Sequence, residues 1–300
     1  MALHHDPSWP RAGSWFAPNQ EQSVDFAILG VGAHTSAITQ NNADKTPAAI
    51  RESLMRYSTW NNTCQIDFAE ILTGADFGDV SDAENQDAST NEISESLFKT
   101  DFLVLLGGDN SITYSGVMAL AKSVGGIEKV GLITLDAHHD VRDGVSNGSP
   151  IRQLIEAGLS GEHVVQIGIS DFANSKFYAD RVNEYGIHVI DRASLRNSAL
   201  QEVAAAALAI AGDGHRAIYI DVDMDVCDRS VTPGCPAATP GGISADELRQ
   251  LVALLAADPR VKAADITEID ATIDSPDGRT VRLAALTILE MATSRALLRQ

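Results

Sequence analysis

The chain has 300 residues, of which 44% are hydrophobic, and carries a formal net charge of −19 at neutral pH. A chain of this length and composition can bury a large core, and we expect one domain over residues 1–300 with an irregular extension at residues 1–20. The negative field repels polyanions, which argues against binding to nucleic acid or to an anionic membrane.

The cysteines and the apolar stretches bear on the cellular compartment. Cys64, Cys227 and Cys235 are odd in number and lack CxxC spacing, so neither a disulfide framework nor a zinc knuckle is indicated. The N-terminal sequence has no apolar run of signal-peptide length, and no later stretch is long enough to span a bilayer. We therefore expect a cytoplasmic protein.

Short runs rich in Val, Ile and Leu alternate with longer helical patterns, which is typical of βαβ units around a mainly parallel sheet. Strands are predicted at residues 24–31, 101–107, 130–136, 163–168, 188–191, 217–223 and 263–268. Helices are predicted at residues 47–57, 111–123, 150–157, 199–211, 245–256 and 283–299. Thr46 before Pro47 and Ser244 before Glu247 predict helix starts, and residues 76–91 are predicted to be a solvated connection.

Polar clusters follow four of the predicted strands. They are GGDN at 107–110, DAHHD at 136–140, DVDMD at 221–225 and TEID at 267–270. The carboxyl ends of the strands in an open parallel sheet form the ligand crevice, so the four clusters are expected to converge there.

Two of these clusters, DAHHD and DVDMD, each place three potential metal ligands at alternate positions. Residues with this spacing point to the same side of an extended segment. Several carboxylates on one side repel one another and are costly to bury unless a cation neutralises them, which favours a divalent metal. Oxygen ligands with a little imidazole suit Mn²⁺ better than a structural zinc. The residues concerned are Asp136, His138 and Asp140 in the first cluster and Asp221, Asp223 and Asp225 in the second.

These motifs resemble those of the arginase/agmatinase (ureohydrolase) family from about Ile28 to the C-terminus. LDAHHDVRD resembles the DAHxD metal motif, and YIDVDMDVCDRSVTPG resembles the second DxD motif. LGGDNSITY resembles GGDHS, and TPAAIRESL resembles an N-terminal TPxxIR stretch. The resemblance implies an arginase-like fold of the α/β class, with three layers (α/β/α) and a mainly parallel central sheet. It also implies two Mn²⁺ ions per subunit, a small-molecule substrate and a homo-oligomer, either a trimer or a hexamer.

The resemblance also implies roles for individual residues. A hydroxide held between the two metal ions would attack the amidine carbon. Asp140 would orient this hydroxide and pass a proton to the departing amine, and Glu268 would hold the planar amidinium. The metal ligands implied in this way are Asn110, Asp136, His138, Asp140, Asp223 and Asp225.

Asn110 departs from the family pattern, because it stands where GGDH supplies a histidine ligand. An amide oxygen binds first-row transition metals more weakly than imidazole does. One metal position is therefore expected to bind less tightly, or to recruit another ligand or water. His139 is near in sequence, but the alternation of side chains points it away. The site is then either a tuned binuclear one or one that retains a single tight metal.

The loops resemble those of formimidoylglutamases more than those of agmatinases or arginases. The strings that carry this resemblance are DGVSNGSPIRQLIE, VVQIGISDFANS, TPGCPAATPGGIS and EIDATIDSPDGRT. Agmatinases usually carry histidine at the position of Asn147. The implied reaction is hydrolysis of N-formimino-L-glutamate to L-glutamate and formamide.

A substrate with two carboxylates needs local cations in a protein of this negative charge. Arg142 is the preferred partner, because guanidinium matches carboxylate bidentately. The predicted substrate-binding residues are Arg142, Asn147, Ser149 and Arg152.

Two other readings keep the fold. In the first, the substrate is agmatine or another guanidino compound and urea is released. In the second, Asn110 marks a degenerate metal site and the protein is a non-catalytic binding or regulatory member. The retained inward-facing carboxylates argue against the second reading, because a decayed site has no physical reason to keep charges that repel one another.

Overall fold

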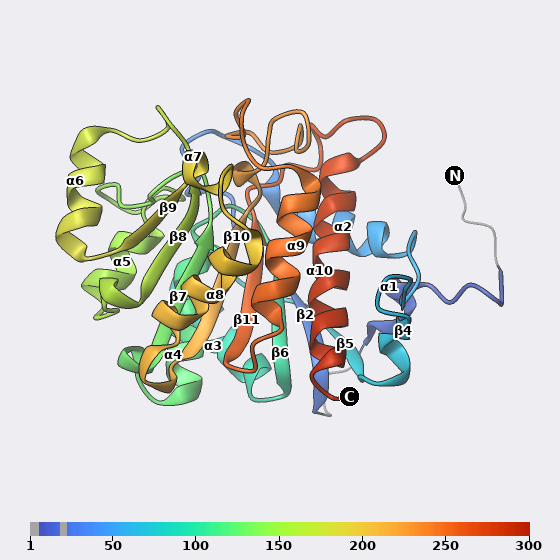
Figure 1. Ribbon diagram of the computed structural model, residues 1–300. Coiled ribbons are helices and arrows are strands. Elements are labelled where there is room, and N and C mark those ends of the chain that lie inside the picture. The colour runs from blue at the N-terminus through green and yellow to red at the C-terminus, as the bar shows by residue number, and fades with distance from the viewer. Residues whose placement is uncertain (1–5, 19–22) are drawn as a thin grey trace.

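A single sheet of nine parallel strands organises the computed structural model, which describes residues 6–18 and 23–300 (Figure 1). The strand order is β1-β5-β2-β6-β11-β10-β7-β8-β9, and every neighbouring pair runs parallel. The predicted strands are confirmed to within two residues at each end. The strands are β1 (Ala17–Pro18), β2 (Val24–Val31), β5 (Gly74–Asp79), β6 (Thr100–Gly107), β7 (Val130–Leu135), β8 (Val164–Ile169), β9 (His188–Asp191), β10 (Ala217–Asp223) and β11 (Val261–Thr267).

Helices cover both faces of this sheet, so the predicted three-layer α/β/α arrangement is confirmed. One face packs against α2 (Thr46–Leu54), α8 (Leu200–Ala211), α9 (Ala245–Ala256) and α10 (Arg279–Leu297). The last three lie in front of the sheet in Figure 1. The opposite face packs against α3 (Gln86–Leu97), α4 (Ile112–Val124), α5 (Pro150–Glu156) and α6 (Lys176–Tyr185).

The central strands are apolar along their whole length because both of their faces are buried. All six residues of β7 and of β8 are buried, as expected for parallel strands between two helix layers. The rings of Phe26 and Phe102 stack across β2 and β6 with their centroids 5.2 Å apart. The central strands therefore share one core on each face, while the division of the chain into domains stays a prediction.

The predicted solvated connection at residues 76–91 is wrong, because this segment contains the end of β5 and the start of α3. The helix begins at Asn85, whose side-chain oxygen accepts hydrogen bonds from the backbone N–H groups of Asp87 and Ala88. It packs against α4 with few large side chains, Ile93 being its one buried large apolar residue. A polar composition therefore concealed a helix that is held by a cap and by close contact with its neighbour.

Residues 1–20 were expected to be irregular, and within the described part (6–18) two short elements form. Helix α1 spans Ala12–Trp15, and β1 adds a parallel strand beside β5. Residues 1–5, 19 and 20 lie outside the described residues. The remaining short elements are a hairpin of β3 (Trp60–Asn61) and β4 (Ile66–Asp67), and helix α7 (Arg192–Leu195).

The strand order brings the four polar clusters together. Strands β6, β11, β10 and β7 are adjacent in the middle of the sheet, although β11 lies far from β6 in sequence. Each of these strands ends at one of the clusters predicted to carry chemistry. The convergence expected at the carboxyl edge is therefore a consequence of the topology. No helix within the described residues is long and apolar enough to cross a membrane.

The two predicted helix starts have different outcomes. Ser244 accepts a hydrogen bond from the backbone N–H of Glu247 (3.1 Å), and the Glu247 carboxylate accepts one from the N–H of Ser244 (2.7 Å). This capping box at the start of α9 is confirmed. Thr46 does not cap α2, because its hydroxyl donates to the backbone carbonyl of Ile269, in the loop after β11.

We expect Ser244→Ala to lower the free energy of unfolding by about 1 kcal/mol, because the N–H of Glu247 loses its acceptor. The measurement is a urea unfolding curve. Ser244→Asp keeps an acceptor at the same place and serves as the matched control, so equal losses in the two variants would contradict the capping role.

Candidate functional site

The predicted acidic residues meet in a buried crevice at the carboxyl edge of the four central strands. Each side chain is at most 8% exposed. Like charges at this depth repel one another and lose hydration, so the crevice is built to hold a compensating cation. The residues concerned are Asp136 after β7, Asp140 in the loop beyond it, Asp223 and Asp225 at the end of β10, and Glu268 after β11.

Asp136, His138 and Asp225 form a compact group in which potential ligand atoms lie within 4.8 Å of one another. His138 Nδ1 lies 2.7 Å from Asp225 Oδ2 and 3.7 Å from Asp136 Oδ1. Backbone donors fix both carboxylates: the N–H of His138 donates to Asp136 (2.6 Å), and that of Ala137 donates to Asp225 (3.0 Å). The ends of β7 and β10 are thus tied together around one set of oxygen and nitrogen donors.

Asn110 connects two other acidic groups. Its side-chain Nδ2 donates to Asp140 Oδ2 (2.5 Å), and its backbone N–H donates to Glu268 Oε1 (2.8 Å). Its side-chain oxygen accepts from the hydroxyls of Thr113 (2.8 Å) and Thr267 (3.0 Å). Both acceptor positions of the Asn110 side-chain oxygen are therefore used, and one of its two Nδ2 N–H groups is directed at Asp140.

Asp140 and Glu268 both adopt left-handed backbone conformations, with φ of 52° and 61°. Such a conformation costs a non-glycine residue on the order of 1–3 kcal/mol and persists where the surroundings determine it. Glu268 is held by its N–H, which donates to the carbonyl of Gly108 (2.9 Å). The strain turns both carboxylates into the crevice at the point where β7 and β11 have ended.

All of these acidic groups except Asp225 resist ionisation in this environment. Burial would raise the pKa of Asp225 too, but His138 and the backbone N–H of Ala137 together lower it below its ordinary value. Burial, followed by the charges of neighbouring carboxylates, raises the pKa of Asp136 and of Asp223 well above the ordinary value. Burial raises the pKa of Asp140 to about 7 and that of Glu268 to about 8. Burial alone would lower the pKa of His138, but its contacts with Asp225 and Asp136 raise it to about 12. A divalent cation would relieve this repulsion, so the donor set fits a metal.

A second layer of buried polar residues lies behind the crevice. It includes Asp221, which the DVDMD spacing grouped with Asp223 and Asp225, and Asp265, which no sequence motif identified. Asp265 accepts from the hydroxyl of Tyr219 (2.9 Å). Its Oδ2 also lies 3.0 Å from the hydroxyl of Thr113, whose single hydrogen can be donated either to Asp265 or to Asn110. Asp221 lies beside Asp265 on β10, and burial, then the Asp265 charge, raises the pKa of Asp221 well above its ordinary value. The sequence could have indicated this layer through Asp265, the one aspartate of β11, because an acidic residue in a buried strand requires polar partners.

His139 points away from the acidic group, as predicted. Its Nδ1 lies 2.7 Å from the side-chain oxygen of Gln166 on β8, and its backbone N–H donates to Asn174. Burial lowers the pKa of this imidazole, which favours its neutral form. The ring is therefore committed to β8 and does not join the potential ligand group around Asp136.

The loop after β7 carries the predicted substrate-binding residues. Asn147 Nδ2 donates to Glu268 Oε1 (2.9 Å). Ser149 is fully buried, and its hydroxyl lies 2.9 Å from both the N–H and the carbonyl of Ser146. The guanidinium of Arg152 contacts the carbonyls of Arg142 and Gly144 and the carboxylate of Glu156. Ser149 and Arg152 thus hold the loop in place.

Arg142 differs from these residues, because its guanidinium makes no hydrogen bond or ion pair within residues 6–18 and 23–300. It is exposed and lines a cavity of about 240 Å³ together with His138, Asp140, Asn174 and Tyr178. An uncommitted guanidinium beside this cavity can bind a carboxylate through two parallel hydrogen bonds.

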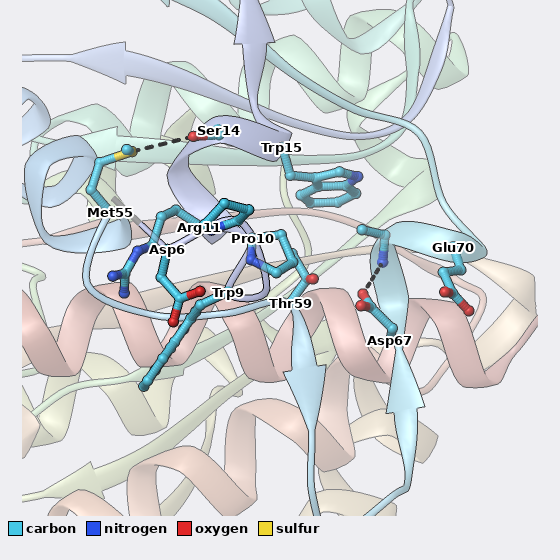
Figure 2. A pocket seen from close by; sticks show the side chains of 12 residues that line it. Asp6, Trp9, Pro10, Arg11, Ser14, Trp15, Met55, Thr59, Asp67 and Glu70 are labelled. Atoms are coloured by element: carbon cyan, nitrogen blue, oxygen red, sulfur yellow. Dashed lines mark hydrogen bonds between the residues drawn. The ribbon is translucent and has the colours of Figure 1, made fainter. Parts of the chain in front are cut away.

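A larger pocket of about 570 Å³ lies near the N-terminus and contains none of the predicted site residues. Figure 2 shows the indole rings of Trp9 and Trp15 in this pocket, which Asp67 and Glu70 also line. Among the described residues that line this pocket, no group of potential metal ligands lies together, so the crevice at the carboxyl edge is the candidate site.

Comparisons with known proteins agree with this geometry. The model of the arginase family matches residues 24–293. The formimidoylglutamase of Halalkalibacterium halodurans is 35% identical over 93% of this chain and 90% of its own length. The crystal structure of formimidoylglutamase from Bacillus subtilis superposes with a TM-score of 0.91 at 30% identity, covering 99% of this chain and 95% of the other. The structure of Trypanosoma cruzi formiminoglutamase with Mn²⁺ has a TM-score of 0.83 at 25% identity and covers 96% and 98% of the two chains. The resemblance seen in the sequence motifs is confirmed.

Without a metal ion, the protein is expected to lose stability as the pH rises from about 5 to about 8. Asp140 and Glu268 have raised pKa values in the folded state, so the folded state binds more protons than the unfolded state in this window. Each kcal/mol lost should lower the melting temperature by about 2–4 °C. A divalent cation replaces those protons when it binds. A saturating concentration of Mn²⁺, about 1 mM, should therefore raise the melting temperature more at pH 8 than at pH 6.

Thermal unfolding in EDTA and in Mn²⁺ at the two pH values measures this effect. Asp136→Asn should largely remove the response to Mn²⁺, whereas Asp246→Asn, on the exposed side of α9, should retain it. An equal stabilisation by Mn²⁺ at both pH values would contradict the linkage between proton release and metal binding.

Proposed function

The chain belongs to the arginase family, and we propose that it is a manganese-dependent hydrolase that converts N-formimino-L-glutamate into L-glutamate and formamide. The observation that carries this proposal is an uncommitted arginine, Arg142, beside a buried acidic crevice. The relatives that are similar over most of the chain and bear the name formimidoylglutamase support the choice of substrate.

The acidic crevice is the proposed manganese site, with two ions per subunit. When bound, manganese lowers the pKa of coordinated water and polarises the carbon under attack. Asp136, His138 and Asp225 already place their donor atoms together, and the raised pKa values of the carboxylates supply the driving force for a cation. The full proposed ligand set is Asn110, Asp136, His138, Asp140, Asp223 and Asp225.

Asn110 fits this ligand set through its threonine partners. The hydroxyls of Thr113 and Thr267 can accept hydrogen bonds as well as donate them. If the Asn110 amide turned so that its oxygen and nitrogen exchanged places, the two hydroxyls would accept from the nitrogen. The amide oxygen would then face Asp140 and the other proposed ligands. The Thr113 hydroxyl could donate to Asp265 in that arrangement.

Two carboxylates are proposed to act on the substrate directly. Glu268 accepts hydrogen bonds from the cationic amidine, and its fixed backbone orients the group above the acidic crevice. Asp140, buried in the loop after β7, passes a proton to the amine nitrogen that leaves as glutamate. Both carboxylates lie on loops that follow central strands, so neither has to move far to reach the same ligand.

Arg142 is proposed to bind a carboxylate of the glutamate portion. Its position beside Asp140 places a positive charge at the edge of the crevice, where the negative field of the protein would otherwise repel the substrate. Ser149 and Arg152 would contact the substrate directly only if their present bonds to the loop were broken. Their role in this proposal is to hold the loop that carries Arg142.

We also propose that the protein works in the cytoplasm as a homo-oligomer, a trimer or a hexamer. The support is the sequence resemblance to the family together with the absence of a membrane-spanning helix within the described residues. Light scattering coupled to size-exclusion chromatography would distinguish these assemblies from a monomer.

The first assay supplies purified, manganese-loaded protein with N-formimino-L-glutamate, agmatine, arginine and guanidinobutyrate in parallel. We expect formamide from the first substrate and no urea from the others. Urea from a guanidino compound would keep the mechanism but replace the substrate. The absence of turnover together with at most about one bound metal ion per chain would favour a non-catalytic family member with a degenerate metal site.

Arg142→Ala is expected to raise the KM for N-formimino-L-glutamate about 10- to 100-fold, because a charge-assisted hydrogen bond is worth about 1.5–3 kcal/mol. Arg142→Lys should recover part of this loss, since it keeps the charge but not the planar fork. Arg196→Ala, which removes another exposed arginine, is the control. A fall in kcat with an unchanged KM would contradict a role in substrate binding.

A further inference from the structure

Glu268 has one carboxylate oxygen that is already saturated. Its Oε1 accepts from the backbone N–H of Asn110 (2.8 Å) and from Nδ2 of Asn147 (2.9 Å). A carboxylate oxygen has two lone pairs, so both of its acceptor positions are used. Oε2 accepts no hydrogen bond from any residue that the structure describes. Glu268 therefore offers the crevice one free oxygen.

Asn147 is itself fixed in place. Its side-chain oxygen accepts from the N–H of Ile38 (3.0 Å), and its backbone N–H donates to the carbonyl of Ser36 (3.3 Å). The oxygen contact determines which end of the amide faces Glu268, because the opposite orientation would place two acceptors together at Oε1 and two donors together at Ile38. The loop after β2 thus directs the Nδ2 donor of Asn147 at Glu268.

Glu268 cannot readily turn its other oxygen inward. Its backbone is in the left-handed region, and its N–H is bonded to Gly108. The donor from Asn110 is a backbone group at the start of α4, which side-chain rotation does not move. The occupied oxygen is therefore a fixed property of the site.

The number of free oxygens distinguishes two kinds of cationic group. A guanidinium and a formimino group can both present two parallel N–H bonds to a carboxylate, but a guanidinium has a third nitrogen whose N–H groups also need acceptors. A formimino group has two nitrogens and a C–H where the guanidinium has its third nitrogen. With Oε1 saturated, a guanidinium would leave an N–H group unpaired in a buried site, which is costly. A formimino group requires fewer acceptors.

We infer that Asn147 is a specificity-determining residue, which selects a formimino group over a guanidino group by occupying Oε1 of Glu268. This inference rests on the proposed function, because it names the feature by which the same site recognises its substrate class. Asn147 acts through Glu268 and is a positioning residue.

The test compares Asn147→Ala and Asn147→Ser with wild type on two substrates that share the glutamate portion, N-formimino-L-glutamate and N-amidino-L-glutamate. We expect the ratio of kcat/KM for the guanidino compound to that for the formimino compound to rise about tenfold or more in both variants. Ser146→Ala, which removes a hydrogen bond in the same loop without contacting Glu268, should leave the ratio unchanged.

A binding measurement gives a second readout that does not require turnover. Acetamidinium and guanidinium have similar shapes, but acetamidinium carries a methyl group in place of the third nitrogen. Calorimetry on the manganese-loaded protein should show a preference for acetamidinium in wild type, and this preference should shrink about tenfold in Asn147→Ala.

The outcomes separate the two proposals. Suppose that wild type hydrolyses the formimino substrate, and that both variants keep the wild-type ratio of kcat/KM values and the wild-type preference for acetamidinium. The role of Asn147 is then overturned and the proposed function stands. If wild type hydrolyses neither substrate but the binding preference shifts with Asn147, the proposed function fails and the selection by Asn147 stands.

Discussion

Repulsion between buried carboxylates is the constraint on which the rest of the structure depends. Four adjacent strands deliver acidic side chains to one edge of the sheet, where water cannot screen them. The fold tolerates this arrangement because backbone N–H groups, His138 and the Asn110 amide each satisfy part of the charge. The same arrangement attracts cations strongly. The repulsion between the carboxylates therefore determines both the metal affinity of the crevice and the stability of this edge of the sheet.

Asn110 joins the two halves of the crevice. Its amide contacts Asp140 on the metal side, while its backbone N–H contacts Glu268 on the substrate side. The threonines behind it continue into the buried pair of Asp221 and Asp265. A change at this position therefore reaches metal binding, substrate orientation and the polar core together, which is why its departure from histidine cannot be understood from one metal ligand alone.

The sequence predicted the features that arise from local patterns. The apolar runs of the central strands and the spacing of Asp136, His138 and Asp140 were sufficient to place the crevice, because a parallel sheet gathers strand ends. Helix α3 was missed since its stability comes from the Asn85 cap and from contact with α4 rather than from an apolar stripe. The bond between Asn147 and Glu268 could not be predicted, because it joins loops that are separated by 121 positions and depends on how they pack.

Arg152 gives the loop after β7 a property that matters for recognition. Its guanidinium ties together the carbonyls of Arg142 and Gly144, and the buried Ser149 hydroxyl closes the same loop from the other side. The backbone there has already lost its conformational entropy when the chain folds. A ligand that binds Arg142 then has to immobilise one side chain instead of a whole segment. The entropy lost when this surface loop binds an anion is therefore as small as that of a binding site on a rigid helix end.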